Sequence, residues 1–246
     1  LDEGGNRLWP ADLRINRDRG GAVQSMPAIA VDASGALVVA WGDNRQGYGQ
    51  LFLQRYDDQG APLWPEDVAV HANRLEQGQA APALALGAED DLYVAWHDSS
   101  TGNYDIYVQR LALADGRPLW QVPVRANTDT SYAPQTAPAI APTADGGVSI
   151  AWLDQRIGRG DIYLRQFDAD GTAAGAEIQV NIASAGAARG PRLVRSSDGT
   201  SVIAWIGAAD GLLYVQKLDG AGASLWPAGL AANQPSQAPN LGPQPA

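Results

Sequence analysis

Aspartate and arginine recur at a fixed distance behind tryptophan, and this pattern has the most chemical potential in the sequence. The phrase Trp-x-Asp-x-Arg stands at 41–45 and at 152–156, and residues 96–100 keep its tryptophan and aspartate. Such carboxylates could hold a cation or act as acids in catalysis. However, an aspartate that begins a tight turn usually accepts hydrogen bonds from backbone N–H groups, and a nearby arginine pairs with it. We therefore expect these residues to be mainly structural.

Three tyrosines, at 48, 104 and 132, lie in polar loops between apolar runs, so they are better candidates for ligand contact than tyrosines within strands. Together with the aspartates and arginines they define a candidate interaction face. Its members are Asp43, Arg45, Tyr48, Asp98, Tyr104, Tyr132, Asp154 and Arg156.

Metal and cofactor sites are not expected. Asp168-x-Asp170-Gly171 is similar to a fragment of a calcium loop but lacks the later ligands and the closing glutamate, so it indicates an ordinary turn. His71 and His97 stand in unrelated parts of two repeats, and the chain contains no cysteine. This composition excludes disulfides, thiol catalysis and cysteine-ligated zinc, and we predict no bound cofactor.

The elements that must position these residues are repeated. Trp41, Trp96, Trp152 and Trp205 are separated by 55, 56 and 53 residues, and each closes a similar apolar run. A second ladder, at Trp9, Trp64, Trp120 and Trp226, has the same period with one member missing near Ala174. Two ladders of one period indicate an internal repeat.

Each repeat contains four short runs rich in Val, Ile, Leu and Tyr, separated by Gly, Asp, Pro or Asn, which is typical of strands. Four strands at this period predict an all-β fold, a β-propeller of four-stranded antiparallel blades with four full repeats plus a partial one. We place the propeller at 1–233, with a partial blade at 1–26, repeats at 27–81, 82–137, 138–190 and 191–233, and a Pro/Gln-rich tail or start of a further strand at 234–246.

The partial blade leaves two arrangements open. The chain is either a piece of a longer propeller, or its N-terminal strand and C-terminal segment share a closing blade that lacks its middle strands.

Two motifs carry a family resemblance. The corner motif resembles the W-x-D-x-R-x-G-x-x-D-I-Y phrase of repeat propellers in bacterial secreted and cell-surface proteins, although residues 205–211 depart from it. The phrase Asp-x-x-Gly-x-x-x-Trp, at 2–9, 57–64 and 219–226, is similar to the tryptophan-docking phrase of quinoprotein-type propellers. That resemblance implies that the indole of one blade packs against the next blade. The charged funnel that a quinone needs is missing from the sequence.

Composition narrows the functional classes. A net charge of −10 argues against binding a nucleic-acid backbone, and no apolar run is long enough to span a membrane. Together with the resemblance, this predicts an extracellular or cell-surface protein, with the periplasm as a further option.

Enzyme motifs are missing from the sequence. The glycine of the turn, Gly35, lies six residues before Trp41 rather than the three of a sialidase box, and the first strands are apolar. We therefore predict a non-enzymatic protein-recognition or scaffolding propeller of a bacterial secreted or cell-surface assembly, contacting a protein partner or a neighbouring subunit. Two alternatives stay open: a carbohydrate-binding, lectin-like propeller, and a fragment of a larger propeller enzyme of the glycosidase or sialidase kind.

Overall fold

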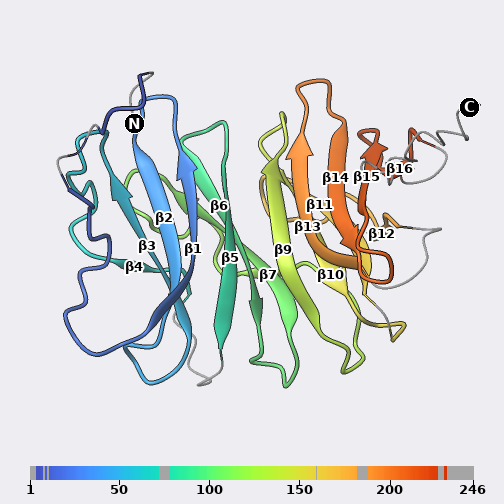
Figure 1. The fold of residues 1–246 in the computed structure, drawn as a ribbon, viewed down its shortest axis with the longest axis horizontal. Helices are drawn as coiled ribbons and strands as arrows, with labels where there is room; N and C mark the ends of the chain where they lie inside the picture. Colours follow the sequence, from blue (N-terminus) through green and yellow to red (C-terminus); the bar gives the residue numbers. More distant parts are fainter. Residues whose placement is uncertain are drawn as a thin grey trace, which may run out of the picture.

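The computed structural model describes residues 4–7, 9, 11–71, 78–158, 160–181, 188–226 and 230–231. These residues form an all-β structure of four antiparallel sheets with four strands each (Figure 1). Sheet one contains β1 (Gln24–Val31), β2 (Leu37–Asp43), β3 (Gln50–Tyr56) and β4 (Val68–Ala69). Sheet two contains β5 (Gln79–Leu86), β6 (Asp91–Asp98), β7 (Asp105–Ala112) and β8 (Val124–Arg125).

The other two sheets repeat this order. Sheet three contains β9 (Gln135–Pro142), β10 (Val148–Asp154), β11 (Asp161–Phe167) and β12 (Ile178–Gln179). Sheet four contains β13 (Ala188–Arg195), β14 (Ser201–Gly207), β15 (Leu213–Leu218) and β16 (Leu230–Ala231). Strands that follow one another in the chain pair side by side in every sheet. The prediction of four four-stranded antiparallel units is confirmed.

Tight turns join the first two strands of each sheet, and in sheet one Asp32 fixes the turn. Its Oδ1 accepts hydrogen bonds from the backbone N–H groups of Ser34 at 2.9 Å and Ala36 at 3.0 Å. Gly35 supplies the left-handed backbone that the turn requires, with φ of 84°. Hydrogen bonding to Ser34, and then to Arg55, lowers the pKa of Asp32 to about 2 although burial opposes the shift.

A bulge interrupts the first strand of each sheet just before a proline. Met26, Ala81 and Ala137 have positive φ of 50° to 52°, and the equivalent Gly190 has φ of 55°. Pairing with the second strand shifts register at each of these places. Each predicted repeat starts at the proline that follows the bulge, and each first strand begins three residues before that proline. The bulge lets the strand continue through proline, which has no N–H to donate to the pairing with the second strand.

The sheets stack face to face in chain order, and a tryptophan of the first ladder lies in each interface. Trp96 lies in the apolar cluster between sheets one and two, Trp152 between two and three, and Trp205 between three and four. Trp41 instead faces the N-terminal segment, where Trp9 and Leu13 cover it. These interfaces are the core of the molecule.

The first three tryptophans of the second ladder each dock onto the following sheet by a hydrogen bond. The indole N–H of Trp64 donates to the carbonyl of Leu113 at 3.2 Å, and that of Trp120 donates to Ala169 at 2.9 Å. Trp9 makes the same bond to Asp58 at 3.0 Å. The expectation that these rings pack against the following unit is met at all three places.

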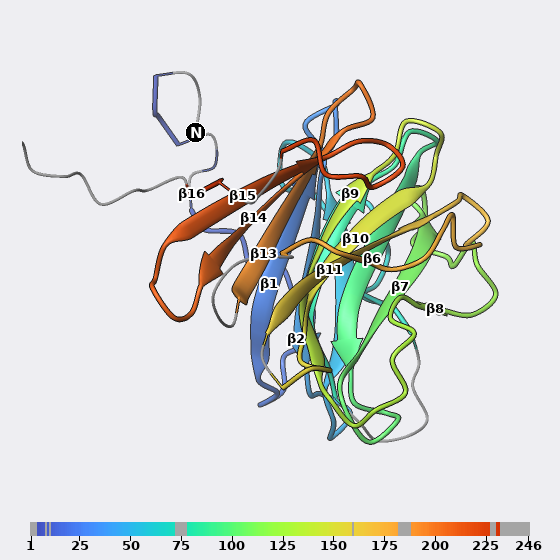
Figure 2. The ribbon, with the colours of Figure 1, turned by 90° about the vertical axis from the view of Figure 1, so that its right-hand side faces the viewer.

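The first and last sheets form the two ends of the row. The inner strands β1, β5, β9 and β13 follow one another across the molecule, and Figure 2 views the row from the sheet-four end. Residues 11–16 lie against sheet one but form no strand there, unlike the expected copy of a fourth strand. The expected tail at 234–246 lies outside the described residues. Within the described part, no helix is long and apolar enough to cross a membrane.

Candidate functional site

The loops after the second strand and after the fourth strand lie along one edge of the stacked sheets, which we call the loop face. The backbone ties them together in pairs. Gln79 N–H donates to Gly49 O at 3.0 Å, Gln135 N–H to Tyr104 O at 2.8 Å, and Ala188 N–H to Gly160 O at 2.7 Å. The loop face therefore carries the candidate residues on a frame of repeated hydrogen bonds.

At the first corner, Asp43 and Arg45 form a closed unit. Asp43 accepts hydrogen bonds from the Trp41 indole at 3.1 Å, the Arg45 backbone N–H at 2.8 Å and the Arg45 guanidinium at 2.7 Å. The guanidinium also reaches Asp67 at 3.0 Å and lies 4.0 Å from the centroid of the Phe52 ring. Both charges are thus satisfied internally.

The third corner repeats this arrangement. Asp154 accepts hydrogen bonds from the Trp152 indole at 3.0 Å and from Nε of Arg156 at 2.9 Å. Arg156 bonds to Glu177 at 2.7 Å and lies 4.2 Å from the Tyr163 ring centroid. The expectation that these arginines pair with the corner carboxylates agrees with this geometry.

Electrostatics favours the ionised form of Asp43 and the charged form of Arg156. Burial acts to raise the pKa of Asp43, but hydrogen bonds from Arg45, Trp41 and Gln24 outweigh it and lower the pKa to about 2. For Arg156, burial opposes the charge, yet hydrogen bonds to Asp154 and Glu177 raise its pKa. A carboxylate whose pKa is lowered in this way is a poor proton donor, which disfavours Asp43 as a general acid.

The second corner lacks the arginine. Asp98 still accepts from the Trp96 indole at 3.3 Å and from the Ser100 backbone N–H at 2.7 Å, but Ser100 replaces the arginine of the other two corners. The fourth sheet carries Gly207 where the others have aspartate, as its departing motif indicated.

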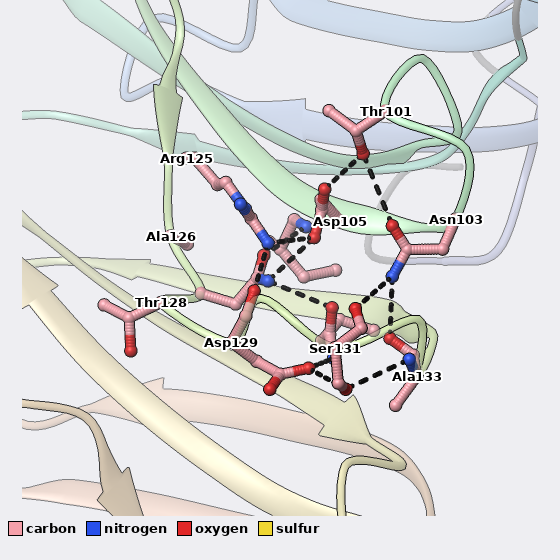
Figure 3. A network of polar contacts seen from close by, with 12 residues as sticks. Thr101, Asn103, Asp105, Arg125, Ala126, Thr128, Asp129, Ser131 and Ala133 are labelled. Carbon is pink, nitrogen blue, oxygen red and sulfur yellow. Dashed lines mark hydrogen bonds and ion pairs between the residues drawn. The ribbon is translucent and has the colours of Figure 1, made fainter.

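A polar network connects the loops of sheets two and three (Figure 3). The buried Asp105 carboxylate accepts hydrogen bonds from Thr101 at 2.5 Å, Arg125 at 2.5 Å and Asn127 at 2.9 Å. Asn103 crosses the gap between the loops, donating to Ser131 O at 3.2 Å and Ala133 O at 2.9 Å. The network holds the 126–134 loop in a fixed position.

Asp129 lies at the edge of this network. Burial acts to raise its pKa, but the hydrogen bonds of Ser131 and Gln135 and the charge of Arg156 lower it on balance. Gln135 also contacts Asp154 at 3.4 Å, which links the network to the third corner.

The three loop tyrosines differ in exposure. Tyr132 is 88% exposed and Tyr104 is 41% exposed, whereas Tyr48 is half-buried. Tyr104 follows Asn103, and Tyr132 lies between the two carbonyls that Asn103 holds, so the two exposed rings stand on adjoining loops. The His97 ring backs Tyr104, with centroids 4.8 Å apart, and burial lowers the pKa of that histidine.

Sequence reasoning missed the residues that build the network. Asn127 and Asn181 stand at equivalent positions of the second and third repeats. The side-chain oxygen of each accepts a hydrogen bond from a backbone N–H at the start of the third strand, from Ile106 at 2.8 Å and from Ile162 at 2.7 Å. The recurrence of asparagine at this repeat position could have indicated a shared structural role. Arg125 carried none, because the equivalent residues of the other sheets are Ala69 and Gln179.

The described residues contain no cluster of three or more His, Asp or Glu side chains that could hold a metal ion. Asp170 accepts a hydrogen bond from the Thr172 backbone N–H at 2.8 Å within its own turn. The arrangement can therefore do two things: brace the loops, and present Tyr104 and Tyr132 to a ligand.

No protein-family model and no curated protein matches the sequence. Several solved structures match the fold. A protein of unknown function from Dyadobacter fermentans matches with a TM-score of 0.63 and 13% identity, over 86% of this chain and 70% of that one. The Hadza microbial sialidase Hz136 matches with a TM-score of 0.61 and 12% identity, over 81% of this chain and 45% of that one.

An α-L-arabinanase from Penicillium chrysogenum matches with a TM-score of 0.59 and 16% identity, over 81% of this chain and 63% of that one. The chain thus spans less than two thirds of either named enzyme. At these identities the likeness establishes the fold.

The comparisons correct one expectation. We predicted a non-enzymatic recognition or scaffolding module, but the fold is the one that sialidase, arabinanase, arabinofuranosidase and galactanase structures share. The sequence argument failed because it rested on the missing sialidase-box spacing and on the apolar first strands, whereas one fold can host many different functional sites.

Proposed function

We propose that this chain forms part of a carbohydrate-active β-propeller enzyme, in which each sheet is a blade, and that its loop face contributes glycan contacts. Three features support the proposal. The inner strands of the four sheets follow one another, the sheets bury each other's faces, and the similar structures are largely glycan-acting enzymes.

One observation carries the glycan contact: Tyr104 stands where the neighbouring sheets have glycine. The backbone hydrogen bonds from Gln79, Gln135 and Ala188 place Gly49, Tyr104 and Gly160 at one repeat position. A Cβ at Gly160 would meet the Ala188 carbonyl at 2.8 Å, so this position disfavours side chains. Sheet two nevertheless carries an exposed aromatic ring there, which points to a task beyond packing.

The two exposed tyrosines suit a sugar ring. Each offers an apolar ring face with a hydroxyl at its edge, and an amphipathic ring of this kind matches a sugar, which has C–H faces and hydroxyl edges. The Asn103 hydrogen bonds fix the loop that carries Tyr132, and His97 backs Tyr104, so little conformational entropy is lost on binding.

Glycoside hydrolysis also requires two carboxyl groups, one of them protonated. In the described part of the loop face, Asp43 and Asp154 are paired with arginine, and Asp105 is bonded to Arg125 and Asn127. Asp98 has no arginine partner and accepts hydrogen bonds from the Trp96 indole and the Ser100 backbone N–H. We therefore assign this face to glycan positioning. The extracellular or cell-surface location predicted from the sequence remains part of the proposal.

Binding measurements test the proposal. Calorimetry with arabino-oligosaccharides, β-1,3-galacto-oligosaccharides and sialyllactose should detect binding of at least one probe, and reducing-end assays should be run on the same probes. Tyr104→Ala and Tyr132→Ala should each weaken that binding about tenfold, whereas Tyr48→Ala, the half-buried loop tyrosine of sheet one, should leave it unchanged. Failure of all three probes to bind or react, or equal loss in all three variants, would contradict the proposal.

A further inference from the structure

The second corner contains a small pocket whose counterparts in sheets one and three are filled by arginine. The pocket has a volume of about 240 Å³ and is lined by His71, Trp96, Asp98, Ser100, Tyr107, Val122 and Pro123. Pockets for drug-sized ligands measure roughly 300–1,000 Å³, so this pocket suits a single head group. We call it the sheet-two slot.

Sheets one and three show what such a slot accepts. In both, a guanidinium lies between the corner aspartate, a second acid from the residue before the fourth strand, and the face of an aromatic ring. For Arg45 these partners are Asp43 at 2.7 Å, Asp67 at 3.0 Å and the Phe52 ring centroid at 4.0 Å. Arg156 has Asp154, Glu177 and the Tyr163 ring in the same roles.

Sheet two keeps the aromatic pair and the corner aspartate but lacks the arginine that lies between them in sheets one and three. The Trp96 and Tyr107 rings stack with centroids 6.1 Å apart at 23°, close to the 6.2 Å and 20° of Trp152 and Tyr163. Asp98 keeps its hydrogen bonds from the indole and from the backbone N–H of residue 100. The arginine is replaced by Ser100, and the second acid by Pro123, which precedes β8 as Asp67 precedes β4 and Glu177 precedes β12.

The two replacements leave the slot with an unbalanced charge. In the other corners two carboxylates face one guanidinium, whereas sheet two has lost the guanidinium and the second of the two carboxylates. What remains is one buried carboxylate, Asp98, which is 3% exposed, at the end of a pocket with an aromatic wall. A carboxylate beside an aromatic face attracts a cation, and planar guanidinium satisfies both at once.

We propose that the sheet-two slot binds a guanidinium group from outside the chain, as an arginine side chain presents it. The group would stack on Tyr107 and donate hydrogen bonds to Asp98, as Arg45 and Arg156 do in their own sheets. This inference is independent of the glycan proposal, because it concerns the corner of sheet two and not the exposed tyrosines.

Titration of the protein with N-acetyl-arginine methylamide, followed by the indole N–H signals in NMR, tests the inference. The Trp96 signal, assigned with Trp96→Phe, should shift and saturate. The citrulline analogue has the same shape without the charge and should bind at least about tenfold more weakly. An arginine-containing peptide, run in parallel, distinguishes free arginine from a peptide source by its tighter binding.

Two variants sharpen the test. Ser100→Arg combined with Pro123→Glu rebuilds the occupant of sheets one and three, and should abolish the titration while the other indole signals stay in place. Arg45→Ser empties the slot of sheet one, and should add a second site that shifts the Trp41 signal. Equal binding of the arginine and citrulline probes, no binding of either, or unchanged binding by the double variant would overturn the proposal. If the double variant does not fold, absence of a new site in Arg45→Ser overturns it instead.

Discussion

At the scale of single residues, the corner aspartate is a buried acceptor that organises its surroundings. Asp43 receives the indole N–H, a backbone N–H and a guanidinium, and its side chain is fully buried. Removing one member of a buried ion pair lowers the free energy of unfolding by more than the intact pair contributes, because the remaining charge is left buried without a partner. The sequence predicted this role from the turn position. The sequence shows that Ser100 replaces the arginine, but it could not predict that the replacement leaves an open pocket, because the pocket depends on how the surrounding side chains pack.

Asp43→Asn should change the acid dependence of stability. The folded-state pKa of Asp43, about 2, lies below its ordinary value of 3.8, so its contribution is complete above that value and is lost as the pH falls toward the folded-state pKa. The variant should be less stable than the parent at neutral pH, and its stability should fall less steeply between about pH 4 and pH 2. Urea unfolding across that range measures both effects. Asp58→Asn, at an exposed position, is the control, and parallel curves for Asp43→Asn and the parent would contradict the expectation.

At the scale of elements, the first strand of each sheet was the least predictable. The prolines indicated a strand start, yet the strands begin three residues earlier and pass through a left-handed residue. Met26, Ala81 and Ala137 give no signal for positive φ, because ordinary side chains disfavour it, and only Gly190 marks the position. The other strands followed from alternation and turn residues, which depend on local physics.

Gly190→Ala should isolate the strain of the bulge. A Cβ at Gly190 meets nothing within 4 Å, so the cost is conformational alone, and we expect destabilisation of about 1–2 kcal/mol. The fold should survive, because alanine already occupies this position in sheets two and three. Gly175→Ala, where a Cβ also meets nothing, is the control without positive φ. Chemical denaturation compares the two, and an equal effect of both substitutions would disprove the strain.

At the scale of the whole molecule, stability is distributed over interfaces between neighbouring sheets. Each of the three clusters between sheets contains a buried tryptophan from the first ladder. The tryptophan spacing was sufficient to predict this, because repeated large apolar residues must be buried by repeated neighbours. The proposed glycan contact was not predictable in the same way, because it rests on Tyr104, a residue at which one repeat departs from its neighbours.

Trp96→Ala should weaken the joint between sheets one and two. Truncation of a large buried aromatic residue costs about 3–5 kcal/mol, and in a row of stacked units the loss should separate the unfolding of sheet one from that of the rest. Calorimetry should show a lower transition temperature and a broadened or divided transition. Trp96→Phe retains most of the apolar area and should keep a single transition. An unchanged melting temperature in Trp96→Ala would refute the assignment of this interface.

The docking bonds of the second ladder have a direction. Each indole donates forward to a carbonyl of the following unit, and the three bonds span the same 49 residues although the tryptophans are 55 and 56 apart. The extra residue falls in the short turn after the acceptor. The row of sheets is therefore polar, because these three bonds all point from the N-terminal side of the row toward its C-terminal side. Gain or loss of a repeat that carries this tryptophan would leave the other indole bonds with the same acceptor position, so the number of such sheets can change during evolution without redesign of these joints. The sheet that has lost its tryptophan near Ala174 does not share this linkage.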